Sequence, residues 1–335
     1  MKSIGRILLF CICVVCIASG LYAGGKAEAS KEPVKVKYTF YDVFWDAQDP
    51  NLAWFTKGAK DFMVRFPEVR IEVVSAEKWG AEPYLRVLET VMAKKPDGLV
   101  ICVVDPVAIE GTMKMALAQG IPVVQATLKD TRGNALPYLT YMGGDEYLSG
   151  KALGERLLKE FTPKHVVTAM EAVGHAGAEL RAQGMGDVVT KVGAKYDKLM
   201  IGDEQSHAKS TLTAFLTRNP DVDAIFTTAM FATEWIYSVM QEMGRTDIKL
   251  VSVDESPLNI EGILQGKVLA TFSQGFYAQA TMPYAWLYYY LEYGITPPRE
   301  ILTGPIVVDK SNVAKFKKTA LEVFGEEIYK KTTPW

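Results

Sequence analysis

Short apolar runs alternate with longer amphipathic stretches along most of the chain. The short runs are rich in β-branched and aromatic residues and predict strands, whereas the longer stretches repeat apolar residues with the period of a helix. The predicted strands are Val34–Phe40, Arg70–Val74, Gly98–Val104, Pro122–Gln125, Leu139–Met142, His165–Met170, Leu199–Gly202, Ala224–Thr228, Lys249–Val253 and Val268–Ser273. The predicted helices are Leu52–Phe66, Tyr84–Lys94, Val107–Ala118, Tyr147–Phe161, Ala178–Val192, Lys209–Thr217, Thr233–Met243 and Leu258–Leu264.

This alternation of strand and helix indicates the α/β class, with parallel sheets covered by helices on both faces. The run GLVICVV (98–104) is almost wholly apolar, as expected for a strand buried on both faces. Ligands of such sheets bind beyond the carboxyl ends of the strands, where the loops converge. The site is therefore expected in the segments that follow the strands: Tyr41–Asn51, Asp105, Thr127–Asp130, Glu171–Arg181, Asp203–Glu204, Ala229–Met230, Asp254–Glu255 and Gln274–Phe276.

The start of the chain has a different pattern. Two basic residues precede the uncharged apolar run Ile7–Ala18, which has 12 residues, and the small-residue segment Ser19–Ala23 follows it. This arrangement predicts a secretory signal peptide over residues 1–23 and a flexible tether over residues 24–32. The expected location is therefore the periplasm.

Two alternatives to a cleaved signal peptide are membrane attachments. An uncleaved anchor is disfavoured because a spanning helix needs about 20 apolar residues. A lipid anchor on Cys16 is disfavoured because Val14 and Val15 stand where a small residue is expected before a lipidated cysteine. Cleavage would leave Cys102 as the only cysteine, so an internal disulfide is not expected.

Composition excludes several functional classes. The 335 residues are 49% hydrophobic and 23% charged, which is typical of a globular protein, and the net charge is −2. Nucleic-acid binding would require a basic surface, so no nucleic-acid partner is expected. With 3 histidines, a His-rich metal centre is poorly supplied. No GxGxxG or GxxxxGK[ST] motif follows a predicted strand, and no cofactor is expected.

Seven segments, taken in order, resemble type I periplasmic sugar-binding proteins, the ribose and glucose/galactose binders that feed ABC importers. Together they cover nearly all of the chain after the predicted tether. The segments are DPVAIEGTMKMALAQGIPVV (105–124), MGGDEYLSGKALGERLL (142–158), GHAGAELRAQGM (174–185), LTRNPDVDAIFTT (216–228), KLVSVDES (249–256), GKVLATFSQ (266–274) and VVDKSNVAKFKK (307–318).

The resemblance implies a periplasmic binding protein type I fold. Two doubly wound parallel-sheet lobes are joined by a hinge that the chain crosses three times. The implied N-terminal lobe is 33–128 plus 275–303, and the implied C-terminal lobe is 129–274 plus 304–335. The ligand is expected between the lobes, which close over it by hinge motion.

The resemblance also implies a ligand-binding set. Asp49, His175 and Arg181 match sugar-binding positions of the glucose/galactose branch. Asn51 falls where that branch has an aromatic platform, so either Trp45 or Trp54 is expected to replace the missing ring. The full set is Trp45, Asp49, Asn51, Asp105, His175, Arg181, Asp254 and Gln274.

The remaining three residues of the set match other features of the family. Asp105 matches the aspartate used by ribose binders. Asp254 matches the carboxylate that clamps two hydroxyls, and Gln274 matches the amide at the hinge. A sugar suits such residues, since carboxylates accept from adjacent hydroxyls, Arg donates through a fork and Trp covers the C–H face.

Several positions depart from the family pattern. Ala229-Met230 replaces an Asn-Asp pair, Asp203 replaces an aromatic residue, and Gly177 and Cys102 replace an Asp and an Asn of the glucose/galactose branch. The segment Phe161–His165 is too short for the calcium loop of that branch, so no metal is expected. These departures leave the identity of the sugar open.

Structural roles compete with the binding roles. Asp105 stands before Pro106 and could cap the following helix, because Asp at the N-cap with Pro at N1 is a common helix start. Asp145 is interpreted as a cap. Arg181 could form a surface ion pair, and His175 could be a solvated loop residue.

The predicted function is a secreted solute-binding protein that binds a monosaccharide-like ligand for an ABC importer, without being an enzyme. The expected partners are the sugar and the importer's membrane subunits, and a chemoreceptor is a further candidate. One alternative is a non-sugar ligand such as a nucleoside or small signalling molecule, which the apolar Ala229-Met230 would suit. A glycoside-processing enzyme is another alternative, since such enzymes use paired carboxylates.

Overall fold

The computed structural model of the protein describes residues 34–133 and 135–333. The predicted signal peptide and tether lie outside these residues. The segment Val36–Trp335 forms one compact unit, and the description that follows is of this unit alone. None of the described helices has the length and hydropathy required to span a membrane.

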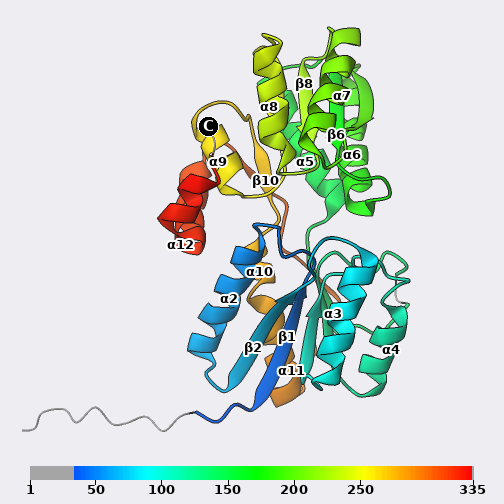
Figure 1. Ribbon diagram of the computed structural model, residues 1–335, viewed down its shortest axis with the longest axis vertical. Coiled ribbons are helices and arrows are strands. Elements are labelled where there is room, and N and C mark those ends of the chain that lie inside the picture. The colour runs from blue at the N-terminus through cyan, green and yellow to red at the C-terminus, as the bar shows by residue number, and fades with distance from the viewer. Residues whose placement is uncertain (1–33, 134, 334–335) are drawn as a thin grey trace, which may run out of the picture. The chain divides into compact units, whose positions relative to one another are not determined.

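The first sheet of this unit has six strands, and every adjacent pair is parallel. Figure 1 shows it with α2 on one side and α3 and α4 on the other. In order across the sheet, its strands are β11 (Glu300–Leu302), β5 (Thr140–Gly143), β4 (Val123–Thr127), β3 (Gly98–Ile101), β1 (Tyr38–Phe44) and β2 (Val69–Ser75).

Alternating side chains of the central strands enter two cores. Phe40 packs with apolar residues of α2 and α11, whereas Tyr41 and Val43 pack with α3 and α4. The period of two along a strand explains this division, because successive side chains point to opposite faces. The helices of this sheet are α2 (Leu52–Arg65), α3 (Ala81–Ala93), α4 (Glu110–Ala118), α10 (Phe276–Gln279) and α11 (Met282–Tyr293).

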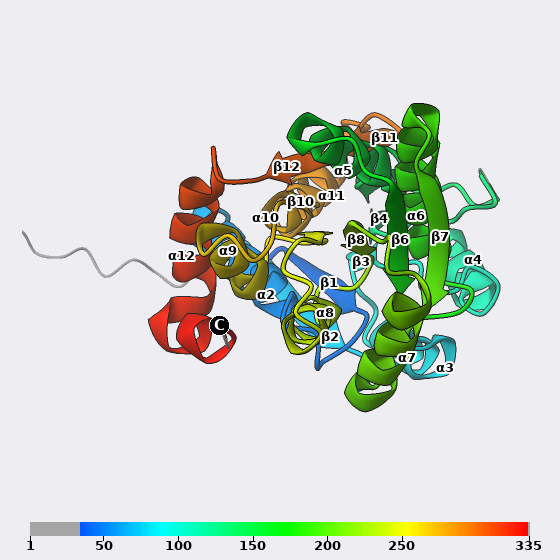
Figure 2. The same ribbon diagram turned by 90° about the horizontal axis from the view of Figure 1, so that it is seen from above.

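The second group of strands consists of a four-stranded parallel sheet and an antiparallel pair (Figure 2). A parallel bridge between Val251 and Ala270 joins the two. The sheet has the order β7 (Lys195–Met200), β6 (His165–Met170), β8 (Ala224–Thr227) and β9 (Lys249–Val251), and the pair is β10 (Thr271–Ser273) with β12 (Ile306–Val308).

Helices cover both faces of this second sheet. Leu153 of α5 and Met185 of α6 pack in one core, whereas Leu212 of α7 and Ile236 of α8 pack in the other. The helices are α5 (Glu146–Glu160), α6 (Ala176–Val189, continued by the 3-10 turn Thr190–Val192), α7 (Gln205–Arg218), α8 (Ala232–Glu242), α9 (Pro257–Leu264) and α12 (Val313–Lys331).

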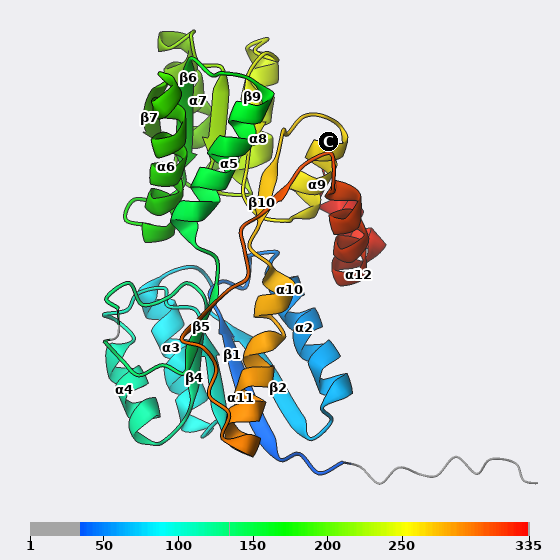
Figure 3. The ribbon, with the colours of Figure 1, turned by 180° about the vertical axis from the view of Figure 1, so that it is seen from behind.

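The chain passes between the two strand groups three times, as Figure 3 shows. The passages run from β5 to α5, from β10 to α10 and from β11 to β12. The three-crossover prediction is therefore confirmed. The predicted boundary after Leu128 is wrong, because β5 pairs in parallel with β4 and belongs to the first sheet. The first passage follows Gly143.

The other predicted elements are present with shifted ends. β1 begins at Tyr38 rather than Val34, and its centre carries Asp42, a charge that breaks the apolar pattern. Asp42 is buried because Tyr284 of α11 donates a hydrogen bond of 2.5 Å to its Oδ2. The elements after β10 were not among those predicted, namely α10, α11, β11, β12 and α12. For β11 and β12, three residues are too few to show an alternating pattern.

The buried Asp42 gives a testable dependence of stability on pH. Burial raises the pKa of Asp42 to about 7, from about 4 in an unfolded chain. The folded state therefore binds this proton more tightly, so the stabilisation is complete below about pH 4 and is lost as pH rises through 7. In this window the free energy of unfolding should fall by up to about 1.4 kcal/mol per pH unit for this group.

The Asp42→Asn variant isolates this contribution, because asparagine keeps an acceptor for Tyr284 but does not titrate. Urea unfolding of both proteins between pH 5 and pH 8 measures it. We expect the variant to lose less stability than the parent over this range. Equal pH slopes for the two proteins would contradict the assignment.

Candidate functional site

A cavity of about 700 Å³ lies where the loops at the carboxyl ends of both strand groups meet. Its lining comes from the loops after all strands from β1 to β10 except β5. Two lining residues, Thr127 and Asp254, have left-handed backbones with φ of 66° and 70°. Non-glycine residues adopt this conformation at an energetic cost, and such residues cluster at binding sites.

The cavity brings together seven of the eight predicted site residues. Those seven are Trp45, Asp49, Asn51, His175, Arg181, Asp254 and Gln274. Of the two candidate tryptophans, Trp45 lines the cavity. Trp54 packs instead against Phe324 of α12, with their ring centroids 5.6 Å apart.

Asp254 lies at the centre of a polar cluster. Gln274 Nε2 donates to its Oδ1 at 2.7 Å, and Asn51 Nδ2 lies 3.4 Å from its Oδ2. All three side chains are buried. The two amide oxygens, Asn51 Oδ1 and Gln274 Oε1, have no hydrogen-bond partner among the described residues. The cluster therefore holds the Asp254 carboxylate in place through two buried amide side chains, whose oxygens are themselves buried and unpaired.

Asp49 is held by its own loop. Trp45 Nε1 donates to Asp49 Oδ2 at 2.7 Å, and the backbone N–H of Asn51 donates to Asp49 Oδ1 at 2.8 Å. Burial raises the pKa of Asp49 to about 6, although both hydrogen bonds oppose the shift. The Trp45 ring is fixed in turn by stacking on Phe44 at 3.8 Å between centroids.

Arg181 is a buried residue of α6 rather than part of a surface ion pair. Its Nε donates to Oε2 of Glu146 on α5, and its Nη1 donates to the Thr228 carbonyl at 3.2 Å. Nη2 has no hydrogen-bond partner in the part of the chain described by the structure, so its N–H groups are available to a ligand. Glu146 neutralises the charge of Arg181.

His175 begins α6, where its Nδ1 accepts from the Ala178 amide at 3.2 Å. Its ring stacks on Trp79, with centroids 5.5 Å apart and an interplanar angle of 8°. Burial and the charge of Arg181 lower the pKa of His175, which keeps the imidazole neutral at pH 7. Trp79 comes from the loop after β2, so this stack joins loops of the two strand groups.

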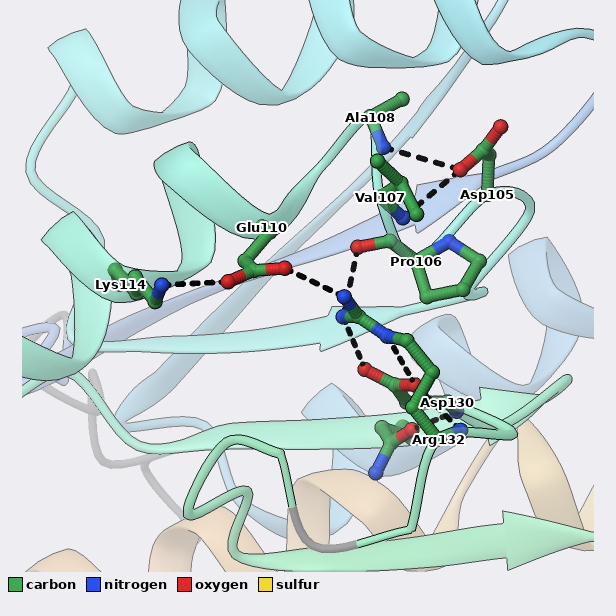
Figure 4. A network of polar contacts seen from close by, with 9 residues as sticks. Asp105, Pro106, Val107, Ala108, Glu110, Lys114, Asp130 and Arg132 are labelled. Atoms are coloured by element: carbon green, nitrogen blue, oxygen red, sulfur yellow. Dashed lines mark hydrogen bonds and ion pairs between the residues drawn. The ribbon is translucent and has the colours of Figure 1, made fainter.

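Asp105 does not line this cavity. Its Oδ1 accepts from the amides of Val107 and Ala108 at 2.8 and 3.0 Å, which caps the turn before α4 (Figure 4). It lines a second cavity of about 510 Å³. The alternative interpretation as a cap is therefore supported, although α4 itself begins later, at Glu110.

The neighbouring loop residue Asp130 also has a structural role. Figure 4 shows Arg132 bridging Asp130, Glu110 and the Pro106 carbonyl. Hydrogen bonds from Arg132 hold the pKa of Asp130 below its usual value. This network fixes the loop after β4 onto α4. Asp145 is likewise a cap, since its Oδ1 accepts from the Leu148 amide at 2.9 Å.

Several lining residues were not predicted. Trp79 and Trp235 lie outside both the seven segments that resemble the family and the predicted loop segments. Trp79 follows β2, and its loop could have been included because the loops after eight of the ten predicted strands were. Trp235 lies inside α8, and no local signal indicates which face of that helix meets the cavity. Four of the residues that depart from the family pattern line the cavity too, namely Cys102, Asp203, Ala229 and Met230, whereas Gly177 lines the second cavity.

Metal binding has no support in residues 34–133 and 135–333. No group of three or more His, Cys, Asp or Glu side chains there has the geometry of a metal site. Four carboxylates of the cavity instead accept hydrogen bonds from the chain, those of Asp46, Asp49, Glu171 and Asp254. The arrangement suits a ligand that brings many hydrogen-bond donors.

Comparison with known proteins agrees with this fold. A family model described as periplasmic binding protein domain matches residues 53–295. The xylose/arabinose-binding protein XylF of Sulfolobus acidocaldarius is 25% identical over 264 residues, covering 73% of this chain and 65% of that protein. The ribose import binding protein RbsB of Escherichia coli is 24% identical over 185 residues, covering 52% of this chain and 59% of that protein.

A solved structure gives the same result at the level of the fold. The carbohydrate transporter from Acidothermus cellulolyticus 11B, in complex with myo-inositol, aligns with a TM-score of 0.75 and 25% identity, over 85% of this chain and 98% of that one. The chain spans less than two thirds of the length of XylF and RbsB. Since the family model covers most of the two strand groups, the chain belongs to the periplasmic binding protein domain family.

Proposed function

We propose that the protein is a periplasmic solute-binding protein that captures a polyol of monosaccharide size for an ABC importer. The observation that carries this proposal is the Asp254 cluster, in which a buried carboxylate lines the cavity together with the two amide side chains that hold it. Adjacent hydroxyls of a sugar donate to such a carboxylate, and a buried acceptor left unpaired costs about 1–3 kcal/mol.

The other lining residues support the same class of ligand. Arg181 offers a donor, while Trp45 and Trp79 offer flat apolar surfaces for C–H faces. The named relatives are a xylose/arabinose-binding and a ribose import binding protein, and the solved neighbour holds myo-inositol. The proposed binding set is Trp45, Asp49, Asn51, His175, Arg181, Asp254 and Gln274. Asp105 is left out of it.

The proposal is for binding without chemistry, at a site between the two strand groups. The ligand would touch loops of both strand groups, so it stabilises the closed arrangement, and the importer's membrane subunits recognise that arrangement. The named relatives are binding proteins rather than enzymes. We propose the same for this chain, with the periplasm as its location.

A nucleoside-like ligand is a second candidate, and one observation favours it. Five aromatic side chains line the cavity together with Ala229 and Met230, and stacked rings hold heterocycles. The five are Trp45, Trp79, Phe231, Trp235 and Phe276.

Mass spectrometry of the ligand released from purified protein tests the proposal. A thermal-shift screen of sugars, cyclitols and nucleosides on the emptied protein should follow. A ligand present at about a thousand times its dissociation constant adds about 4 kcal/mol to the free energy of unfolding. We expect a polyol to raise the melting temperature and to be recovered unchanged. Stabilisation by nucleosides alone, or conversion of the polyol to products, would contradict the proposal.

A further inference from the structure

The main cavity has an excess of negative charge. Its lining contains six carboxylates and one arginine. The arginine, Arg181, is already neutralised by Glu146, which does not line this cavity. His175 Nε2 lies 3.8 Å from Glu171 Oε1. The imidazole adds no positive charge at pH 7, because burial and the charge of Arg181 lower its pKa. The six carboxylates are those of Asp46, Asp49, Glu171, Asp203, Glu234 and Asp254.

None of these six has a Lys or Arg nitrogen within 4.0 Å among the described residues. Asp254 is buried and Asp49 is half-buried, so both have lost much of their hydration. Burial raises the pKa of both groups. The charge of Arg181 opposes this shift at Asp254, whereas no cation opposes it at Asp49. A cation that entered the cavity would offset the negative charge that remains.

The hydrogen-bonding groups of the cavity show the same imbalance. The amide nitrogens of Asn51 and Gln274 already face Asp254, and the indole nitrogen of Trp45 donates to Asp49. The side-chain oxygens Asn51 Oδ1 and Gln274 Oε1 are unpaired, in residues that are 3% and 4% exposed. A neutral hydroxyl brings one donor and also needs donors, whereas an ammonium group brings three donors and accepts nothing.

The aromatic lining is compatible with a cation as well. Trp45 and Trp79 border the same cavity as the carboxylates, and the faces of such rings attract ammonium groups. Arg181 retains a free donor for a hydroxyl elsewhere on the ligand. The charge, the hydrogen-bonding groups and the aromatic rings described above therefore all favour a cationic ligand.

From these observations we infer that the natural ligand is a cationic polyol, a hydroxylated compound that carries a protonated amine, such as an amino sugar. This inference rests on the proposed function and narrows its ligand class. The ammonium group binds beside the Asp254 carboxylate, on the side of the cavity that also carries Asp49. The hydroxyls bind toward Arg181.

Matched ligand pairs test the inference by isothermal titration calorimetry on protein freed of bound ligand. The pairs are glucosamine with glucose, galactosamine with galactose, and glucamine with sorbitol. We expect the amine of at least one pair to bind about tenfold or more tightly than its neutral partner. N-acetylation of that amine, which removes the charge, should abolish the preference.

Two variants link the preference to the carboxylates. Asp254→Asn keeps the left-handed backbone, which asparagine tolerates, and Asp49→Asn keeps an acceptor in the loop. Each should reduce the preference for the amine by about threefold or more while neutral ligands are affected less. The matched control is Glu155→Gln, because Glu155 is an exposed carboxylate of α5 outside the cavity. This variant should keep the full preference for the amine.

The outcomes separate this inference from the proposed function. Equal or tighter binding of the neutral member in all three pairs would overturn the cationic ligand but leave a polyol-binding protein. A preference that persists in both carboxylate variants would also overturn it. If no polyol binds, neutral or charged, the proposed function fails and the inference fails with it.

Discussion

Replacing Asp254 with alanine is expected to weaken ligand binding by a factor on the order of 100, about 3 kcal/mol. The substitution removes the charged acceptor of the site and leaves the nitrogens of Gln274 and Asn51 without their partner. Both losses act on the bound state, because the ligand contacts the same cluster. Calorimetric titration of the ligand recovered from the parent protein measures the effect.

Asp105→Ala is the matched carboxylate control. Asp105 caps the turn before α4, so its loss should cost about 1 kcal/mol of stability and leave the dissociation constant within about twofold. Melting temperatures of both variants show that the proteins are folded. If the two substitutions weakened binding equally, Asp254 would not be the centre of the site, and the original assignment of Asp105 as a ligand would stand.

Gly150→Ala should destabilise the protein by about 3 kcal/mol. Gly150 lies on α5, and a Cβ atom there would be 1.9 Å from the backbone oxygen of Arg181 on α6. The reciprocal position on α6, Gly184, is as close to α5, since its Cβ would be 2.1 Å from the Tyr147 oxygen. Backbone on both sides cannot yield as a flexible side chain would, so the two helices must separate.

This substitution should also reduce ligand affinity, because α6 carries Arg181 and α5 carries its partner Glu146. Thermal unfolding and calorimetry of the same sample measure both effects. Gly111→Ala is the control: Gly111 lies on the exposed side of α4, and nothing lies within 4 Å of its added Cβ. It should stabilise the protein by about 0.5–1 kcal/mol. A Gly150→Ala protein as stable as the parent would show that α5 and α6 are not closely packed.

The repeating elements of the fold were predictable because their signals are local. The helix Leu52–Arg65 and the strand His165–Met170 show their periods within the segments themselves. β1 was displaced because Asp42 interrupts its apolar run. Only Tyr284, 242 residues away in the sequence, explains why that charge is buried.

The site was predictable to the extent that it follows strand ends. Asp254 and Gln274 come directly after β-rich runs, and parallel strands bring such positions to one edge. Trp79 was missed even though it too follows a strand, and Trp235 was missed because it belongs to a helix face. Asp105 follows a strand as well, yet its carboxylate is turned to its own backbone.

The sequence by itself determined the α/β class, the order of strands and helices as far as β10, and most of the residues at the strand ends, because periodicity and turn residues act over short distances. Tertiary structure alone decided which carboxylates share a cavity, which of them lack a cation, and which donors are already used. Those properties depend on contacts between Asn51 and Asp254, or Arg181 and Glu146, that are distant in the chain. Charge compensation and hydrogen-bond pairing are set by distance in space, which no local pattern encodes.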